Sequence, residues 1–465
     1  MPASPARAAA FDILLRVERE SSYASELLHS TAYHDLSTAD HALTTELVMG
    51  VLRWRSLLDD EISTASSQPL KKLDLEVLIA LRLAVYQFRW LTRIPPRAAL
   101  HESVELVKRA RKRSAAPFVN AVLRELSRPL SSRAECVGER SDPTHTVEGP
   151  CLSSTSAVSS SSPRALATCY AHPLWLVERW TNHYGPEAAQ QICRHNQSIP
   201  ATTLRLRTPA AEQQLTAEGI SMAPGSFLAG TRRVLSGDIT KTKSFRATDV
   251  VIQDEASQLI AALVRQDHKQ ILDCCAAPGG KTLAIADGNP GATFTAVEIH
   301  LHRVRLMQSL FPANPQIRIV AADARNLPFT RSFDRILADV PCSGTGTLAR
   351  NPEIKWRLKP DDLKDLHVRQ LAILRSAATH LSPGGRLIYS TCSLEKEENE
   401  DVVEQALNDD RTLRRLDCAT ELNLLKSAGI LTWPDPASLT RGPYLRTIPG
   451  VHPCDGFFAA VIERS

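Results

Sequence analysis

The chain of 465 residues is 43% hydrophobic and 23% charged, and its formal net charge is +4 at pH 7. This length predicts two or three domains, and the composition is typical of soluble globular proteins. A membrane span needs roughly 18 apolar residues in a row, and no stretch approaches that number. The charges of Asp12, Arg16 and Glu18 interrupt the apolar start of the chain, which argues against an export signal. We therefore expect a cytoplasmic protein that acts away from membranes.

The 10 cysteines show no repeated spacing and no CxxC pair, so their pattern predicts neither a zinc site nor a redox motif. Without an export signal we expect the thiols to be reduced, and we expect no metal. The small positive net charge permits binding to nucleic acid without requiring it.

Residues 1–127 are predicted to be helical throughout. Their apolar residues recur at three- and four-residue intervals, the spacing of one helix face, in residues 8–18, 41–62, 75–91 and 118–126. From residue 128 to 164 serine dominates and the periodicity is lost. Such a composition does not bury enough apolar surface to offset the entropy of ordering. We interpret residues 128–164 as a flexible linker, with a regulatory segment as the alternative.

Residues 165–250 mix helical stretches with short strand-like pieces, which predicts a small α+β subdomain. In residues 251–465 strand-like segments alternate with helices. That alternation predicts an α/β domain with a doubly wound, mostly parallel sheet. Ligands of such sheets bind beyond the carboxyl ends of the strands, and the motifs considered next follow predicted strands.

The segment LDCCAAPGGKT, residues 272–282, ends one predicted strand and opens a helix. Its small residues let the backbone approach a ligand closely, and the helix amino terminus offers free N–H groups. A phosphate-binding GxxxxGK[ST] loop would need glycine where Cys275 stands, and a dinucleotide GxGxxG motif is absent. The third interpretation is a site for S-adenosylmethionine, which carries its charge on a sulfonium, an amine and a carboxylate.

Two acidic residues stand at the ends of the next predicted strands. Glu298 ends the second strand, about twenty residues after the glycines, where a carboxylate can accept hydrogen bonds from both ribose hydroxyls. An ordinary exposed carboxylate is the alternative. Asp323 ends the third strand and could accept a hydrogen bond from an adenine amino group.

Two cysteines follow adjacent predicted strands, Cys342 in the Pro-Cys of ADVPCSGTGT and Cys392 in the Thr-Cys of IYSTCS. An activated thiol can add to carbon 6 of a cytosine and make carbon 5 nucleophilic toward a sulfonium methyl group. A base then removes the proton from carbon 5. Asp339, just before Cys342, could hydrogen-bond the nitrogen edge of the pyrimidine. A lone cysteine is commonly buried and inert, but two thiols beside a cofactor loop favour catalysis.

Basic residues are candidates for contacts with the phosphates of a nucleic acid. The run KRARKR can hold phosphates, although a solvated helix face is the alternative, and RNPEIKWR suits phosphate contact and base stacking. The reaction needs an unstacked base, so we expect a cytosine in a loop or in unstructured RNA. The candidate RNA contacts are Lys108, Arg109, Arg111, Lys112, Arg113, Arg350 and Lys355.

Five motifs resemble those of the RNA cytosine-5 methyltransferases of the NOL1/NOP2/Sun family: CAAPGGKT, ILADVPCSGTGT, RNPEIKW, GGRLIYSTCSLEKEENEDVV and DGFFAAVIER. The resemblance covers about residues 165–465. The helical amino-terminal region resembles the NusB-like domain of the bacterial branch that methylates 16S ribosomal RNA. The resemblance implies a Rossmann-like, S-adenosylmethionine-dependent methyltransferase domain and an all-α, NusB-like RNA-binding domain, and we expect a monomer.

Carried over residue by residue, the resemblance implies that Cys392 is the nucleophile and that Cys342 assists product release. DNA enzymes instead attack with the Pro-Cys thiol, so the pair of cysteines favours RNA as substrate. Asp339 would lie between methyl donor and base, Glu298 would bind the ribose of S-adenosylmethionine and Asp323 its adenine. The residues implied to line the cofactor are Cys275, Ala276, Ala277, Pro278, Gly279, Gly280 and Lys281.

Other functions remain open at this point. Within the same chemistry, a tRNA or 23S ribosomal RNA cytosine is the alternative target. A non-catalytic RNA-binding assembly factor would keep the fold without the chemistry, which the intact cysteines and cofactor loop disfavour. A P-loop ATPase is disfavoured by Cys275. At residues 204–208, LRLRT stands where the family often has Arg-Val-Asn.

Overall fold

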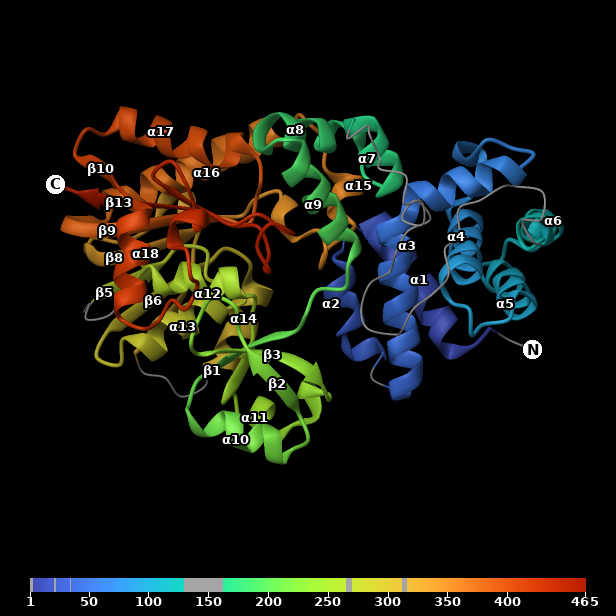
Figure 1. Ribbon diagram of the computed structural model, residues 1–465, viewed down its shortest axis with the longest axis horizontal. Helices are drawn as coiled ribbons and strands as arrows, with labels where there is room; N and C mark the ends of the chain where they lie inside the picture. The colour runs from blue at the N-terminus through green and yellow to red at the C-terminus, as the bar shows by residue number, and fades with distance from the viewer. Residues whose placement is uncertain (1–2, 21, 34, 129–161, 265–269, 312–315) are drawn as a thin grey trace. The chain divides into compact units, whose positions relative to one another are not determined.

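The computed structural model describes residues 3–20, 22–33, 35–128, 162–264, 270–311 and 316–465 (Figure 1). The chain forms two compact units. The helical unit comprises Met1–Pro200 and Leu348–Arg357, and the sheet unit comprises Ala201–Thr347 and Leu358–Ser465. Most of the predicted linker, residues 128–164, lies outside the described residues. Over the part of the chain that is described, no helix is both long and apolar enough to cross a membrane.

The first part of the helical unit is a bundle around one hydrophobic core (Figure 1). Its apolar residues, spaced three and four apart, turn inward, and Phe11, Leu52 and Leu81 are at most 2% exposed. A Cβ at Gly50 would lie 2.0 Å from the Tyr86 ring, so glycine permits this ring to pack against the helix. The predicted all-helical architecture is confirmed. The helices are α1 (Pro5–Glu20), α2 (Ala24–Leu28), α3 (Thr38–Ala65), α4 (Leu75–Trp90), α5 (Pro96–Arg109) and α6 (Ala116–Leu126).

The helical unit also contains later parts of the chain, namely α7 (Pro163–Cys169), α8 (Leu174–Tyr184), α9 (Pro186–Gln197) and α15 (Ile354–Arg357). Gln197 donates hydrogen bonds to the carbonyls of Arg53 in α3 and Tyr170. The sequence analysis assigned the helices from residue 165 onward to the α+β subdomain. Contacts between residues place α7 to α9 in the same compact unit as the bundle, and the α+β subdomain expected from residue 165 stays a prediction.

The sheet unit begins with a small antiparallel sheet in the order β2-β3-β1-β4. Leu204, Leu215 and Val250 belong to its own hydrophobic core. This α+β part agrees with the fold predicted from the sequence. Its elements are β1 (Thr203–Leu206), α10 (Ala210–Ala217), β2 (Ser221–Pro224), β3 (Thr231–Ser236), α11 (Lys243–Arg246) and β4 (Val250–Ile252).

The larger sheet has the order β11-β12-β13-β9-β8-β5-β6-β7, and β10 pairs with β13. Strands β5 to β9 pair in parallel, and β13 is antiparallel to β9. The doubly wound, mostly parallel sheet is thereby confirmed. The strands are β5 (Gln270–Asp273), β6 (Thr293–Glu298), β7 (Ile317–Ala321), β8 (Phe333–Asp339), β9 (Leu381–Thr391), β10 (Leu413–Leu416), β11 (Thr440–Arg441), β12 (Tyr444–Arg446) and β13 (Phe458–Arg464).

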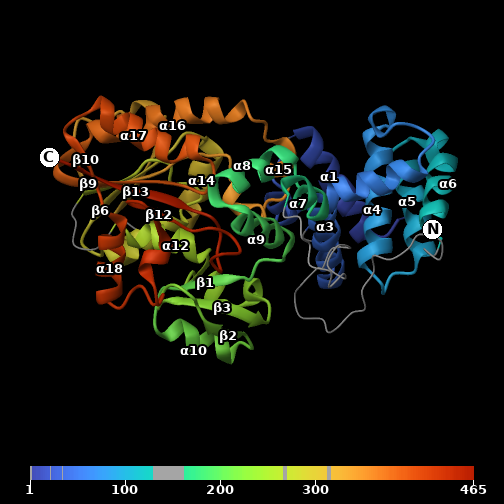
Figure 2. The ribbon, with the colours of Figure 1, turned by 45° about the horizontal axis from the view of Figure 1, so that its top comes forward.

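Helices cover both faces of this sheet (Figures 1 and 2). On one face Ile271 and Leu337 share a core with α12 (Glu255–Ala262), α13 (Gly280–Gly288) and α18 (Cys418–Ser427). On the other face Leu272 and Ile336 pack with α16 (Asp362–Thr379) and α17 (Glu400–Asp409). Met307 of α14 (Leu301–Leu310) packs against Ala296 of β6. The order of the parallel strands reverses at β5, so the carboxyl ends of β5 and β8 form a topological switch point.

Candidate active site

The predicted cofactor loop lies at this switch point, between β5 and α13. Gly279 caps α13 with φ of 108°, a left-handed conformation that favours glycine. The backbone N–H of Cys274 donates to Leu337 and that of Ala276 donates to Val297. These two bonds fix the loop to the ends of β8 and β6, and the α13 amino terminus faces the space beyond the strands.

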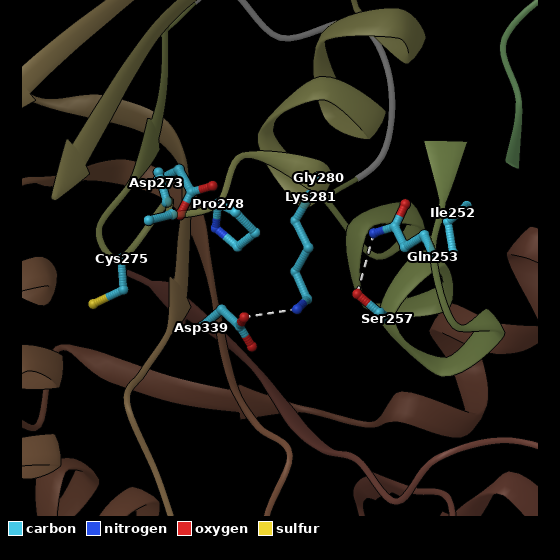
Figure 3. Close-up of a pocket in the computed structure, with 11 residues that line it drawn as sticks. Ile252, Gln253, Ser257, Asp273, Cys275, Pro278, Gly280, Lys281 and Asp339 are labelled. Atoms are coloured by element: carbon cyan, nitrogen blue, oxygen red, sulfur yellow. Dashed lines mark hydrogen bonds and ion pairs between the residues drawn. The ribbon is translucent and has the colours of Figure 1, made fainter. Parts of the chain in front are cut away.

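A cavity of about 150 Å³ opens against this loop (Figure 3). The structure brings together there Asp339 and six of the seven loop residues that the sequence singled out, while Gly279, Glu298 and Asp323 are not among the lining residues. The lining is Ile252, Gln253, Ser257, Asp273, Cys275, Ala276, Ala277, Pro278, Gly280, Lys281 and Asp339.

Asp273 is a site residue that the sequence analysis missed. It ends β5, is 3% exposed, and accepts a hydrogen bond of 2.7 Å from the Thr282 hydroxyl. Its other oxygen, Oδ1, is buried without a hydrogen-bond partner among the described residues. Burial raises the pKa of Asp273 to about 6. A carboxylate at the end of the strand before the loop was the available signal, but many strands end in this way.

Lys281 and Asp339 form an ion pair across the cavity, with Nζ and Oδ2 2.7 Å apart (Figure 3). The Ser390 hydroxyl donates to the other oxygen of Asp339 at 2.7 Å, because Asp339 of β8 and Ser390 of β9 are partners in the parallel register. Burial lowers the pKa of Lys281, but the neighbouring Asp339 carboxylate outweighs it and the net shift is upward. Lys281 therefore carries a positive charge in the site.

Glu298 and Asp323 lie at the ends of β6 and beyond β7, as the strand pattern predicts. Glu298 is 7% exposed and accepts a hydrogen bond of 2.7 Å from the His300 backbone N–H. Asp323 accepts hydrogen bonds from the Arg325 side chain and backbone. These bonds lower the pKa of Asp323 and keep it ionised. Their predicted ribose and adenine contacts remain predictions.

The structure brings the two predicted cysteines together. Cys342 follows β8, Cys392 follows β9, and their sulfur atoms are 3.2 Å apart. The two loops are joined directly, since the Gly346 N–H donates to the Cys392 carbonyl at 2.9 Å. A Cβ at Gly346 would lie 2.2 Å from the Gly456 carbonyl oxygen, so only glycine fits this approach.

The two thiols form a hydrogen bond with each other. The hydrogen bond with Cys392 is the largest cause of a pKa of Cys342 well above its ordinary value, followed by burial. A thiolate is the nucleophilic form of cysteine, and the sulfur–sulfur contact by itself does not select one of the two thiols for attack.

The predicted RNA contacts in KRARKR differ in their surroundings. Lys108 pairs with Glu105, Arg109 with Asp12 and Lys112 with Asp74. Arg111 and Arg113 are exposed, and neither has a carboxylate partner among the described residues.

Lys355 does not lie where an RNA phosphate could reach it. It is 1% exposed, and its ammonium donates to the Arg53 carbonyl of α3 at 3.0 Å. Burial lowers its pKa well below the ordinary value. The sequence interpretation of Lys355 is therefore corrected: the side chain belongs to the interior of the helical unit. Arg350, in the same segment, is half-buried.

In LRLRT, the pair of arginines contacts α13. Arg205 and Arg207 bind the Asp287 carboxylate across 2.6 and 2.8 Å. They therefore tie the small sheet to the helix that follows the cofactor loop.

The chemistry of the residues that line the cavity is compatible with S-adenosylmethionine, the cofactor predicted from the sequence. Asp273 places a carboxylate in the lining, which would attract an ammonium or sulfonium charge, and glycine at 279 and 280 puts no side chain over the backbone of the loop. No group of three or more His, Cys, Asp or Glu residues in the described ranges could hold a metal ion.

Three family models match the chain. The model of the 16S rRNA methyltransferases RsmB/F covers residues 260–463, that of the NusB family residues 4–128, and that of the ferredoxin-like domain of RsmF/B-like methyltransferases residues 172–230.

Relatives cover the full length of the chain. A probable ribosomal RNA small subunit methyltransferase B from Bacillus subtilis is 35% identical over 100% of both chains. The ribosomal RNA small subunit methyltransferase B of Escherichia coli is 31% identical over 92% of each. The crystal structure of PH0851 shares the fold, with a TM-score of 0.77 at 20% identity over 99% of each chain. A methyltransferase homologue from Pyrococcus horikoshii has a TM-score of 0.54 at 24% identity and covers 66% of this chain and 100% of its own. The chain therefore belongs to the RsmB/F family of 16S rRNA methyltransferases, which use S-adenosylmethionine, and it carries a NusB-family domain at its amino terminus.

Proposed function

We propose that this protein methylates carbon 5 of a cytosine in 16S ribosomal RNA through a covalent adduct between Cys392 and carbon 6. The observation that carries the proposal is the pair of thiols 3.2 Å apart at the ends of β8 and β9, three residues after Asp339 in the case of Cys342, and Asp339 lines the cofactor cavity. Family membership and the names of its relatives support ribosomal RNA as the substrate. A protein that modifies ribosomal RNA works where ribosomes are assembled, which supports the cytoplasm as its location.

The cysteines perform the covalent steps. The Cys392 thiolate adds to carbon 6, and the electrons of the ring double bond move to carbon 5. S-adenosylmethionine supplies the methyl group that carbon 5 takes. A base then removes the proton from carbon 5, the ring double bond forms again, and the bond between sulfur and carbon 6 breaks with return of the thiolate. Cys342, in contact with Cys392, assists this release.

Asp339 and Lys281 hold the base beside the thiols. One oxygen of Asp339 is held by Ser390 and the other by Lys281, so the carboxylate is fixed at the edge of the cavity. It accepts a hydrogen bond from the exocyclic amine, or from the ring nitrogen when protonated. That interaction orients the ring, and the positive charge of Lys281 beside it favours the negative charge that thiol addition sends into the ring.

The experiment that tests the proposal is bisulfite sequencing of ribosomal RNA from cells with and without the gene. We expect one 5-methylcytosine of 16S rRNA to disappear on deletion and to return with the wild type. Cys392→Ala should not restore it, because it removes the nucleophile, and the purified variant should lose more than about a thousandfold in rate. Cys169→Ala, which removes a thiol in the helical unit, is the matched control and should restore the methylation.

Cys342→Ala should give a different result. Attack by Cys392 continues while release fails, so a covalent protein–RNA complex should accumulate on denaturing gels. Accumulation in Cys392→Ala and not in Cys342→Ala would reverse the two roles. If every 16S site persisted in the deletion strain and a tRNA or 23S site were lost, 16S rRNA would be ruled out as the substrate. The proposed chemistry would still stand.

A further inference from the structure

The serines that follow the two cysteines bind the same carboxylate. Glu398 ends the short helix η7 (Lys396–Glu398) and is 0% exposed. Its Oε2 accepts hydrogen bonds from the hydroxyls of both Ser343 and Ser393, and its Oε1 accepts one of 2.7 Å from the Ser343 backbone N–H. A single buried group thus bridges the residue after Cys342 and the residue after Cys392.

A side-chain amide extends this bridge to the residue before Cys342. Gln370 of α16 donates to Oε1 of Glu398 at 2.9 Å and to the Pro341 carbonyl at 3.0 Å. Glu398 therefore receives four hydrogen bonds and donates none, which is the pattern of an ionised carboxylate. Such a fully satisfied buried network holds its members in one geometry.

Different charged groups interact with the two thiols. The Glu398 carboxylate adds to the causes that raise the pKa of Cys342, after its hydrogen bond with Cys392, burial and the charge of Cys392. The charge of Cys392 in turn contributes to the raised pKa of Lys281. A negative group disfavours a second negative charge beside it, and a positive group favours one.

We propose that Glu398 is a positioning residue that holds the two cysteine loops in register and makes Cys392, not Cys342, the thiol that ionises and attacks. This inference rests on the proposed function, in which the ionised thiol is the nucleophile. The sulfur–sulfur contact alone does not distinguish the two cysteines. The distinction arises from the Glu398 carboxylate, whose charge raises the pKa of Cys342, and from the Lys281 ammonium, which interacts with the charge of Cys392.

The titratable and charged groups around the pair come from four elements. Burial raises the pKa of Tyr389 in β9, and the charges of Glu398 and Cys342 raise it further. The groups that face the thiols are the two cysteines themselves, Glu398 from η7, Tyr389 from β9, Lys281 from α13 and Asp339 from β8.

The test measures the two thiols in the full-length protein without RNA. Iodoacetamide reacts with thiolates, and peptide mass spectrometry reports Cys342 and Cys392 separately. In the wild type we expect Cys392 to react first, with a half-maximal rate at lower pH than for Cys342. Glu398→Gln keeps the shape and removes the charge, so the Cys342 profile should shift to lower pH, and its rate at pH 7 should rise about tenfold, the equivalent of one pKa unit.

Two further variants separate charge from position. Asp401→Asn removes a carboxylate that pairs with Lys396 across 3.1 Å at the surface, and it should leave both thiol profiles unchanged. Glu398→Asp keeps the charge on a shorter side chain, so Cys392 should still react first. An unshifted Cys342 profile in folded Glu398→Gln would overturn the proposal. If Glu398→Gln does not fold, reversed order in Glu398→Asp would overturn it.

The RNA readout distinguishes this inference from the proposed function. With a 16S rRNA transcript and S-adenosylmethionine, Glu398→Gln should lower the methylation rate and move its pH profile, whereas a purely structural defect would lower the melting temperature and leave the profile in place. If the wild type does not methylate the transcript, the proposed function fails. The alkylation order of the two thiols still decides the role of Glu398.

Discussion

At the scale of single residues, Asp273 joins two properties that rarely coincide, a buried carboxyl group and an oxygen without a partner. Natural proteins satisfy nearly all such atoms. Asp273 lines the cofactor cavity, so its negative charge lies where a positively charged group of a ligand would be attracted. For this family the cofactor is S-adenosylmethionine, whose amine and sulfonium carry positive charges, and we predict that Asp273 attracts one of them.

We predict that Asp273→Asn weakens cofactor binding and stabilises the protein without cofactor. Loss of the negative charge should raise the Kd for S-adenosylmethionine by about tenfold or more, as a hydrogen bond to a charged group is worth roughly 1.5–3 kcal/mol. Isothermal titration calorimetry measures this change. Equal affinity in both proteins would remove Asp273 from the cofactor site.

The stability change should depend on pH with a definite sign. Folding raises the pKa of Asp273 from 3.8 to about 6, so the folded state favours the protonated carboxyl. This contribution is fully present below pH 3.8 and is lost as the pH rises through 6, at a cost of up to about 3 kcal/mol. Asp273→Asn avoids that cost, so its gain in melting temperature should be large at pH 8 and small at pH 4.

The positions of site residues were predictable from the sequence where a motif marked them. The cofactor loop and the paired cysteines carried their spacing and strand context in the chain itself. Asp273 and Glu398 did not, because their importance comes from burial. In the stretch LEKEENE, residues 394–400, four glutamates look alike, and only the folded chain shows that Glu398 faces both cysteine loops.

At the scale of elements, the alternation of strands and helices was sufficient to predict the parallel sheet and its ligand edge. Two assignments were not predictable from it. The helices α7 to α9 and the segment 348–357 pack in the helical unit, because the choice of packing partner depends on shape and on specific contacts. In that segment the Trp356 indole donates to the Leu52 carbonyl at 2.6 Å and Glu353 accepts from the Ala24 N–H at 2.9 Å.

Lys355, in the short helix α15, is a buried charge whose cost can be measured. A buried ammonium whose one described hydrogen bond is to a backbone carbonyl is costly. Lys355→Met keeps the length and removes the charge, so we expect the helical unit to gain about 1–3 kcal/mol of stability at pH 7. Because folding lowers the pKa of Lys355, the wild type should become more stable as the pH rises toward 10, and the advantage of methionine should shrink.

Calorimetric melting of both proteins at pH 7 and pH 9.5 measures this effect. RNA affinity is the second readout, since a buried Lys355 does not contact phosphate. Unchanged stability together with weaker RNA binding in Lys355→Met would favour the interpretation from the sequence over the structure.

At the scale of the whole molecule, a net charge of +4 on 465 residues makes a weak uniform field. Affinity for RNA must then come from local groups whose charge is not already neutralised. In the run 108–113, three of the five basic side chains face carboxylates of the helical unit. Arg111 also has φ of 61°, a left-handed conformation that is uncommon for residues other than glycine and that concentrates at functional sites.

We therefore predict that Arg111 and Arg113 carry the RNA contact of this run. The double variant Arg111→Ala/Arg113→Ala should bind a 16S rRNA transcript more weakly. Its slope of log affinity against log salt should be smaller by about 1.5, as expected for the loss of two phosphate contacts. The matched control Lys108→Ala/Lys112→Ala removes the same net charge from side chains that already have carboxylate partners, and it should change the slope by less than half as much. Filter binding at several salt concentrations measures both, and equal slopes in the two double variants would mean that the run acts only through its total charge.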